Sequence, residues 1–165
     1  MSKLSKGNNA MNTPKHMAYA RTRIGQHEAI GEKENPYIAS CFRLVNMHNA
    51  HDSIDPWCGA FMADCMHSSG YDFPKNAASA RSWLNYGKPL DKPEFGCITI
   101  YSRPTMTSEG MIYDDGIHAH VNFYLFELEP PNSLIEICGL GGNQQNTVGL
   151  NFYFRSRVLG YRWPA

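Results

Sequence analysis

The pattern of apolar residues after position 57 predicts a buried helix. Apolar side chains recur there at i, i+3, i+4, i+7 and i+8, the spacing of one helical face. Asp55 is a typical N-cap residue, and Pro56 suits the first helical position because the N–H that it lacks has no intrahelical partner there. Gly70 provides the stop. The stripe therefore places a cysteine at the start of a core helix and consists of Cys58, Phe61, Met62, Cys65 and Met66.

Other helices are predicted before and after this one. A short helix is expected from His16 to Ile24, and a better-defined one starts at Asn35, where a cap residue again precedes a proline. A further helix is expected to begin at Asn76 and to end at Gly87. The first half of the chain is therefore predicted to be mainly helical.

Past Pro89 the period of the apolar pattern changes from about 3.6 residues to 2, which is typical of strands. The polar segment 104–116 is predicted to be a loop, and the short turn at 130–132 implies antiparallel pairing. Helices followed by strands indicate an α+β domain, with N-terminal helices packed on a C-terminal antiparallel sheet of about five or six strands. The strands are predicted at 96–102, 120–128, 134–138, 148–154 and 158–163.

Length and charge narrow the classes of function. A chain of 165 residues fits one domain, and we expect a flexible tail over residues 1–15 and a single domain over 16–165. With 15 basic and 15 acidic residues and no basic stripe, neither nucleic acid nor an electrostatic membrane anchor is expected as a partner. No run approaches the roughly 20 apolar residues of a membrane span, and the N-terminus lacks the apolar core of a signal peptide. We expect a monomer that is synthesised in the cytoplasm without a signal peptide.

The five cysteines are widely spread and form no C-x-x-C pair. This spacing argues against a disulfide scaffold and a cysteine-rich zinc site, and indicates free thiols in a reducing compartment. A cysteine on an apolar stripe is ordinarily a small buried hydrophobe. Cys58 has an alternative interpretation, because the unpaired N–H groups and the positive dipole end of a helix start favour the thiolate. The core interpretation is preferred for Cys41, Cys65, Cys97 and Cys138.

A nucleophilic cysteine needs a base and a group that orients the base. His120 opens a strand directly after the predicted loop, where its side chain can face the start of a helix packed on the sheet. Asn143 follows paired glycines at the end of the neighbouring strand, from which its side-chain carbonyl can accept the His120 N–H. The order Cys58, His120, Asn143 is the papain-like order.

On these residues the sequence resembles small papain-like cell-wall hydrolases of the NlpC-type and CHAP superfamily, found in bacteria and their phages. The resemblance covers most of the chain outside residues 1–15 and 104–116. The matching stretches are Ile24-Gly25-Gln26 with Glu28 and Gly31, Asn35-Pro36 with Ile38, Pro56-Trp57-Cys58 with Ala60-Phe61, Cys65 with Gly70-Tyr71, Ala80-Arg81-Ser82-Trp83-Leu84-Asn85 with Gly87, Leu90-Asp91-Lys92-Pro93, His120-Val121 with Phe123, Gly141-Gly142-Asn143-Gln144 with Asn146-Thr147-Val148, and Arg157-Val158-Leu159-Gly160-Tyr161-Arg162-Trp163-Pro164.

The resemblance implies a papain-like fold and a cysteine peptidase or amidase that cleaves an amide bond in the peptide stem of peptidoglycan. Cys58 would be the nucleophile, His120 the base and Asn143 the orienting residue, without a metal or another cofactor. A thiolate paired with a protonated imidazole would attack the carbonyl carbon. The backbone N–H of Cys58 would hold part of the charge that develops on the oxygen.

The sequence departs from the family pattern near the histidine and near the asparagine. Ala119 stands where such families usually carry glycine, and Gly141 stands where many CHAP relatives carry glutamate. Because of the second departure, the residue that orients His120 is either Asn143 or Gln144. Asp55 and Trp57 are candidate supporting residues. The Asp55 carboxylate either caps the helix or binds a cationic group of the substrate.

The family offers several substrates and routes of delivery. Related enzymes cleave between D-glutamate and diaminopimelate, between muramic acid and L-alanine, or in cross-bridges. The protein would act on the cell wall or in the periplasm after release through a holin or delivery by a secretion system. An immunity protein is expected as a partner if the chain is a secreted toxin.

Two other interpretations compete with thiol chemistry. His118-Ala119-His120 and the H-x-x-x-D pattern of His48 and Asp52 resemble the ligand pattern of zinc-dependent cell-wall endopeptidases. A non-catalytic protein that binds wall peptide or builds a phage or secretion particle is the second alternative. Arg81 has a surface or packing role in one interpretation and recognises a stem carboxylate in another.

Overall fold

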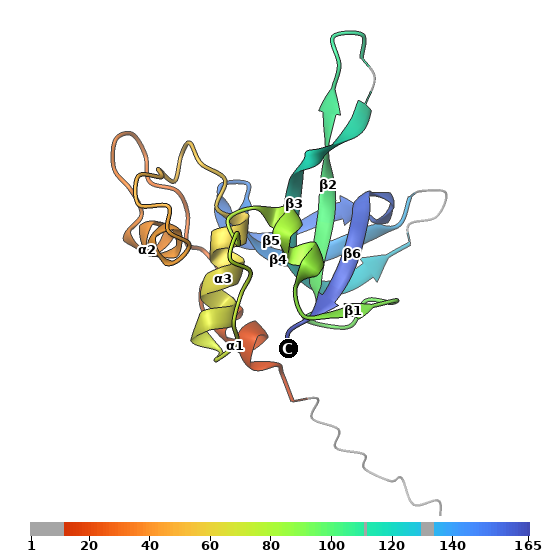
Figure 1. The fold of residues 1–165 in the computed structure, drawn as a ribbon, viewed down its shortest axis with the longest axis horizontal. Helices are drawn as coiled ribbons and strands as arrows, with labels where there is room; N and C mark the ends of the chain where they lie inside the picture. Colours follow the sequence, from red (N-terminus) through yellow and green to blue (C-terminus); the bar gives the residue numbers. More distant parts are fainter. Residues whose placement is uncertain (1–11, 111, 130–133) are drawn as a thin grey trace, which may run out of the picture.

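Three α-helices lie on one side of a six-stranded sheet (Figure 1). The computed structural model describes residues 12–110, 112–129 and 134–165, so most of the predicted tail and the predicted turn at 130–132 lie outside the described residues. The elements are α1 (Lys15–Arg21), α2 (Pro36–Leu44), α3 (Cys58–Ser68), the 3-10 helix η1 (Ala80–Asn85), β1 (Lys88–Leu90), β2 (Ile98–Met106), β3 (Ile112–Leu128), β4 (Glu136–Gln144), β5 (Thr147–Phe154), the 3-10 helix η2 (Arg155–Arg157) and β6 (Val158–Trp163).

The strand order is β1-β6-β2-β3-β4-β5, and every neighbouring pair is antiparallel. The predicted α+β class, with N-terminal helices and a C-terminal antiparallel sheet, is therefore confirmed. None of the helices in the described ranges has the length and apolar character that a membrane span requires.

The two main helices begin differently. Asn35 caps α2 as predicted, because its side-chain oxygen accepts the backbone N–H of Tyr37 at 2.8 Å. The predicted cap of α3 is wrong: the helix begins at Cys58, and Trp57 occupies the N-cap position without a side-chain hydrogen bond. The Asp55 carboxylate instead accepts the backbone N–H of His51 at 2.9 Å, which closes the preceding turn. Local turn formation therefore competes successfully with helix capping here.

The prediction of a loop over residues 104–116 is also wrong. Strands β2 and β3 continue past a register shift between Ser102 and Pro104, and they pair again from Pro104 with Asp114 to Met106 with Ile112. This extension projects beyond the rest of the sheet (Figure 1). A proline is tolerated at such an irregular point because the missing N–H removes no regular ladder bond.

Three smaller boundaries differ from the predictions. The expected helix from Asn76 is reduced to turns followed by η1, and the strand β1 was not predicted. β4 runs to Gln144 through the glycine-rich segment, whereas the predicted strand ended at residue 138.

Side chains alternate between the two faces of the central strands, and both faces are buried. The face toward the helices is apolar and includes Ile98, Ile100, Val121 and Phe123; the opposite face includes Thr99, Tyr101, His120 and Asn122. The Tyr153 ring of β5 stacks on the Tyr101 ring of β2 with a centroid distance of 4.7 Å. In a flat sheet, strands three positions apart would be separated by about 14 Å. The sheet must therefore curl so that β5 covers the polar face.

Candidate active site

Cys58 lies where the first turn of α3 meets two other segments. A Cβ atom on Gly59 would lie 2.1 Å from the Ala77 carbonyl oxygen, so the chain after α3 crosses directly over this turn. A Cβ atom on Gly142 would lie 2.6 Å from the Phe61 side chain, so β4 packs equally closely against the helix. These contacts leave Cys58 only 2% exposed. A substrate can reach the sulfur only if neighbouring side chains move.

Burial raises the pKa of the Cys58 thiol. The Arg103 guanidinium and hydrogen bonds from the backbone of Val121, Gly59 and Cys58 itself lower this pKa, but they do not outweigh burial. The helix start thus lowers the pKa of the thiol, as predicted, but burial raises this pKa by more. The neutral thiol is favoured over the thiolate that the sequence led us to expect.

The thiol lies beside the backbone that carries His120. The pairing of β3 with β4 ends at Phe123 and Leu140, so β4 does not cover the backbone at residues 120 and 121. At this point the Cys58 sulfur contacts the backbone of Val121, the residue that follows His120. The structure therefore brings the predicted nucleophile and the predicted base to the same stretch of β3.

Gln144 holds the His120 imidazole. The amide nitrogen of Gln144 donates to the carbonyl oxygens of Gly139 at 3.0 Å and Gly149 at 2.6 Å. Its Oε1 atom is therefore the acceptor for the two remaining contacts, from His120 Nε2 and Asn122 Nδ2, each at 3.0 Å. This assigns the proton to Nε2, and the lone pair of the neutral ring to Nδ1.

His120 is completely buried, and its Nδ1 atom has no hydrogen-bond partner among the described residues. Burial lowers the pKa of His120 to about 3, against the opposing effect of the hydrogen bond with Gln144. The Tyr153 ring stacks on the imidazole with a centroid distance of 4.9 Å and an interplanar angle of 20°. The ring is thus held in one plane by Tyr153 and in one tautomer by Gln144, and burial keeps it neutral at rest, with an unpaired lone pair on Nδ1.

The orienting hydrogen bond comes from Gln144 and not from Asn143, the residue first assigned to this role. Asn143 has a φ of 54° and lies where the register between β4 and β5 shifts. In an unbroken strand Gln144 would lie on the same face as Gly142, toward α3, but it contacts His120 and Asn122 on the opposite face. The left-handed Asn143 therefore provides the backbone turn that delivers Gln144.

A glycine makes room for the polar cluster around Gln144. A Cβ atom on Gly139 would lie 2.1 Å from the Asn122 side-chain nitrogen. Tyr153 and Asn122, which complete the surroundings of His120, were not predicted as site residues. Strand alternation predicts which side chains share a face of the sheet. It does not predict that the sheet curls and brings β5 over His120.

Of the two candidate supporting residues, Asp55 lines a polar pocket in front of α3, and Trp57 contacts Glu28, another residue of the lining. The buried indole of Trp57 donates to the Glu28 carboxylate at 2.9 Å, which fixes the N-cap residue. Asp55 and Pro56 form one side of the pocket, which has a volume of about 250 Å³. The lining residues are Glu28, Asp52, Ser53, Ile54, Asp55, Pro56, Arg103, Asn143 and Asn146.

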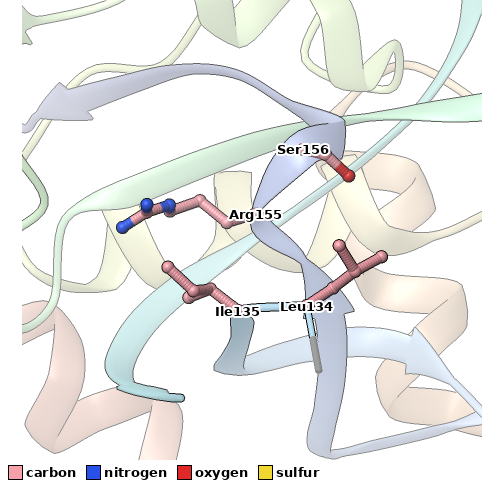
Figure 2. A pocket seen from close by; sticks show the side chains of 4 residues that line it. All are labelled: Leu134, Ile135, Arg155 and Ser156. Carbon is pink, nitrogen blue, oxygen red and sulfur yellow. The ribbon is translucent and has the colours of Figure 1, made fainter. Parts of the chain in front are cut away.

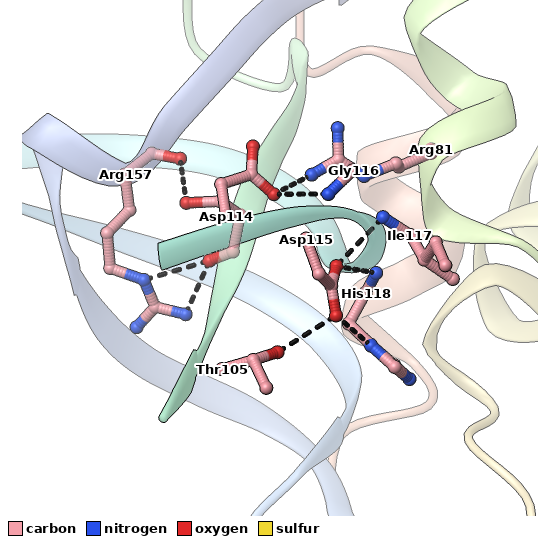
Figure 3. Close-up of polar contacts among 9 residues, drawn as sticks. Arg81, Thr105, Asp114, Asp115, Gly116, Ile117, His118 and Arg157 are labelled. Atoms are coloured by element: carbon pink, nitrogen blue, oxygen red, sulfur yellow. Dashed lines mark hydrogen bonds and ion pairs between the residues drawn. The ribbon is translucent and has the colours of Figure 1, made fainter. Parts of the chain in front are cut away.

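The residues of the alternative zinc pattern have other partners. His118 contacts the Asp115 carboxylate (Figure 3). His120 contacts Gln144. Across residues 12–110, 112–129 and 134–165, no three His, Cys, Asp or Glu side chains form a group that could hold a metal ion.

A separate hollow lies between the start of β4 and η2 (Figure 2). It is lined by Leu134, Ile135, Arg155 and Ser156, and the Arg155 guanidinium donates to the Glu127 carboxylate at 3.3 Å. The Ser156 hydroxyl has no base among the lining residues that could activate it, so this hollow does not compete with the site at Cys58.

No protein-family model matches the chain, and searches of curated proteins and of solved structures gave no significant match. The NlpC-type or CHAP identity therefore stays a prediction from sequence motifs.

Proposed function

We propose that this protein is a papain-like thiol hydrolase that cleaves an amide bond in the peptide stem of peptidoglycan. The observation that carries the chemistry is the unpartnered Nδ1 lone pair of His120, because a neutral thiol needs a base to remove its proton. The choice of peptidoglycan rests on the motif resemblance alone.

The neutral resting pair determines the order of proton transfers. His120 Nδ1 takes the thiol proton as the Cys58 sulfur attacks the carbonyl carbon, and a tetrahedral intermediate forms. The C–N bond then breaks while the same proton passes from Nδ1 to the leaving amine. Water attacks the resulting thioester, His120 accepts a proton from it, and the proton returns to the sulfur as the carboxylic acid leaves.

The helix start supplies a donor for the intermediate. The first backbone bond of α3 runs from the Phe61 N–H to the Trp57 carbonyl oxygen, so the Cys58 N–H has no intrahelical partner. In general, one such donor aimed at the developing oxyanion contributes about 3 kcal/mol to transition-state stabilisation. Gln144 is a positioning residue in this scheme, because it acts through the imidazole.

The burial of Cys58 favours one alternative, a protein that binds wall peptide without cleaving it. Digestion of purified peptidoglycan followed by mass spectrometry of the soluble muropeptides distinguishes the two functions. We expect the wild-type protein to release fragments and Cys58→Ala to reduce the rate at least 1,000-fold with an unchanged circular dichroism spectrum. Cys65→Ala, which removes a buried thiol from the same helix, is the control and should keep the activity.

Two results would overturn the catalytic proposal. One is an equal rate for the wild-type protein and Cys58→Ala. The other is a wild-type protein that sediments with peptidoglycan but releases no fragment, which would establish the binding alternative.

A further inference from the structure

Arg103 lies close to the proposed catalytic pair. It follows Ser102 at the register shift of β2, and its side chain lines the polar pocket beside Asp55 and Pro56. That pocket also borders Asn143, which precedes Gln144. The positive charge of Arg103 lowers the pKa of the Cys58 thiol and that of the His120 imidazole.

The neighbouring arginines have partners, whereas Arg103 has none in the part of the chain that the structure describes. The Arg81 guanidinium pairs with the Asp114 carboxylate (Figure 3). Arg157 donates to the Ser102 carbonyl oxygen at 2.9 and 2.7 Å and lies 5.7 Å above the centre of the Tyr153 ring. Within the described ranges, Arg103 makes no ion pair with a carboxylate and donates no hydrogen bond.

The carboxylates that share the pocket with Arg103 are already used inside the protein. Glu28 accepts the Trp57 indole N–H at 2.9 Å, and Asp55 accepts the His51 backbone N–H at 2.9 Å. Asp52 accepts the backbone N–H groups of Ala29 at 3.1 Å and Asn35 at 2.8 Å. Within the described residues, the Arg103 guanidinium thus lines a polar pocket in which each carboxylate is hydrogen-bonded to another group and none forms an ion pair with it.

We propose that Arg103 binds a free carboxylate of the substrate, a few bonds away from the carbonyl carbon that Cys58 attacks. A guanidinium binds a carboxylate through two parallel N–H···O bonds, so it fixes both position and orientation. This inference rests on the proposed function and adds a requirement to it: the cleaved peptide must carry a carboxylate near the scissile bond.

The wall peptide offers that carboxylate from two sources. A glutamate that is linked through its side chain keeps its α-carboxylate on the acyl side of the bond. A diaminopimelate residue carries a carboxylate on its side chain, on the amine side. In both cases a substrate without the carboxylate leaves a charged site unpaired, and sites of this kind discriminate strongly.

Three cross-linked muropeptide dimers separate these sources. The first contains D-glutamate and diaminopimelate, the second has the glutamate α-carboxylate converted to the amide, and the third has L-lysine in place of diaminopimelate. We expect the wild-type protein to cleave the first dimer with a kcat/KM at least tenfold higher than one of the other two. The dimer that is cleaved slowly identifies the carboxylate that Arg103 binds.

Variants test whether Arg103 is responsible for the discrimination. Arg103→Gln should lower kcat/KM at least tenfold on the carboxylated dimer and leave the rate on the discriminated dimer unchanged, so that the preference disappears. Arg103→Lys should retain part of the preference, because it keeps the charge but not the planar fork. Arg81→Gln, whose guanidinium already has Asp114, is the control and should keep the full preference.

The outcomes separate failure of this inference from failure of the proposed function. Equal wild-type rates on all three dimers, or an equal loss on all three for Arg103→Gln, would overturn the role of Arg103 while leaving the hydrolase intact. No cleavage of any dimer and none of whole peptidoglycan would overturn both proposals.

Discussion

The two faces of the central strands are both buried, but they are stabilised in different ways. The face toward α3 is filled by apolar side chains, whose burial is favourable in any orientation. The opposite face carries polar groups, and burial of a polar group destabilises the fold unless the group forms a well-oriented hydrogen bond. The first face includes Ile98, Ile100, Val121 and Phe123, and the second includes Thr99, Tyr101, His120 and Asn122. We therefore expect the apolar face to determine stability and the polar face to determine the geometry of the base.

The largest effect is expected on the apolar face. Phe123→Ala removes a fully buried ring and leaves a cavity, so the free energy of unfolding should fall by about 3–5 kcal/mol. Urea denaturation measures this loss. The rate per folded molecule should stay near that of the wild-type protein, and a rate that falls in proportion to the stability would contradict the separation of the two faces.

The next effect concerns the geometry of His120. Gln144→Ala removes the acceptor of the Nε2 proton and should lower kcat about 100-fold, or about 2.7 kcal/mol in the activation free energy. Nitrogen chemical shifts of His120 should change from a single tautomer to a mixture. Asn143→Gly removes the side chain of the other candidate orienting residue. Glycine tolerates the positive φ at this position, so this variant should keep most of the activity. The opposite ranking would return the orienting role to Asn143.

The polar face should also make stability depend on pH. The pKa of His120 is about 3 in the folded protein and about 6.5 when unfolded, so between these values the unfolded chain binds more protons. The stability that depends on neutral His120 is therefore fully present above pH 6.5 and is lost as the pH falls toward 3.

The size of this loss can be measured by denaturation at several pH values. Between pH 8 and pH 5 the loss from His120 should be about 2 kcal/mol. His120→Gln should flatten the dependence, whereas His48→Gln at an exposed position should leave it unchanged. Burial lowers the pKa of His16 as well, so part of the dependence should remain in His120→Gln.

The smallest effect is expected outside both faces. Arg81 pairs with Asp114 at the base of the β2–β3 extension, where the two side chains are 20% and 39% exposed. Ion pairs in contact with water contribute less than about 1 kcal/mol. Arg81→Gln should therefore change the urea midpoint only slightly, and a large loss would show that the extension is part of the cooperative fold.

Sequence periodicity predicted the parts of the fold in which local preference and burial agree. The strand at 158–163 matches β6, and the cap and proline at Asn35 and Pro36 start α2 as expected. The prediction failed where another local partner was available. Asp55 caps a turn instead of a helix, and Pro104 interrupts a strand pair without ending it.

The site was predictable in its residue types but not in its details. Cys58 and His120 were found from position in their elements, and the structure brings the Cys58 sulfur to the backbone of Val121, the residue that follows His120. Gln144 was only an alternative, because its contact depends on a left-handed residue that reverses the alternation of β4. Arg103 was missed, because it falls between the strand that was predicted to end at 102 and the loop that was predicted to begin at 104.

The unpartnered Nδ1 atom of His120 also limits how stable this protein can be. A buried polar atom without a hydrogen bond costs about 1–3 kcal/mol of folding free energy. Selection for heat tolerance alone would favour an apolar residue at position 120, which fills the space without that penalty. The histidine is thus a position at which stability and function oppose each other, and screens for thermostable variants need an activity filter to keep it.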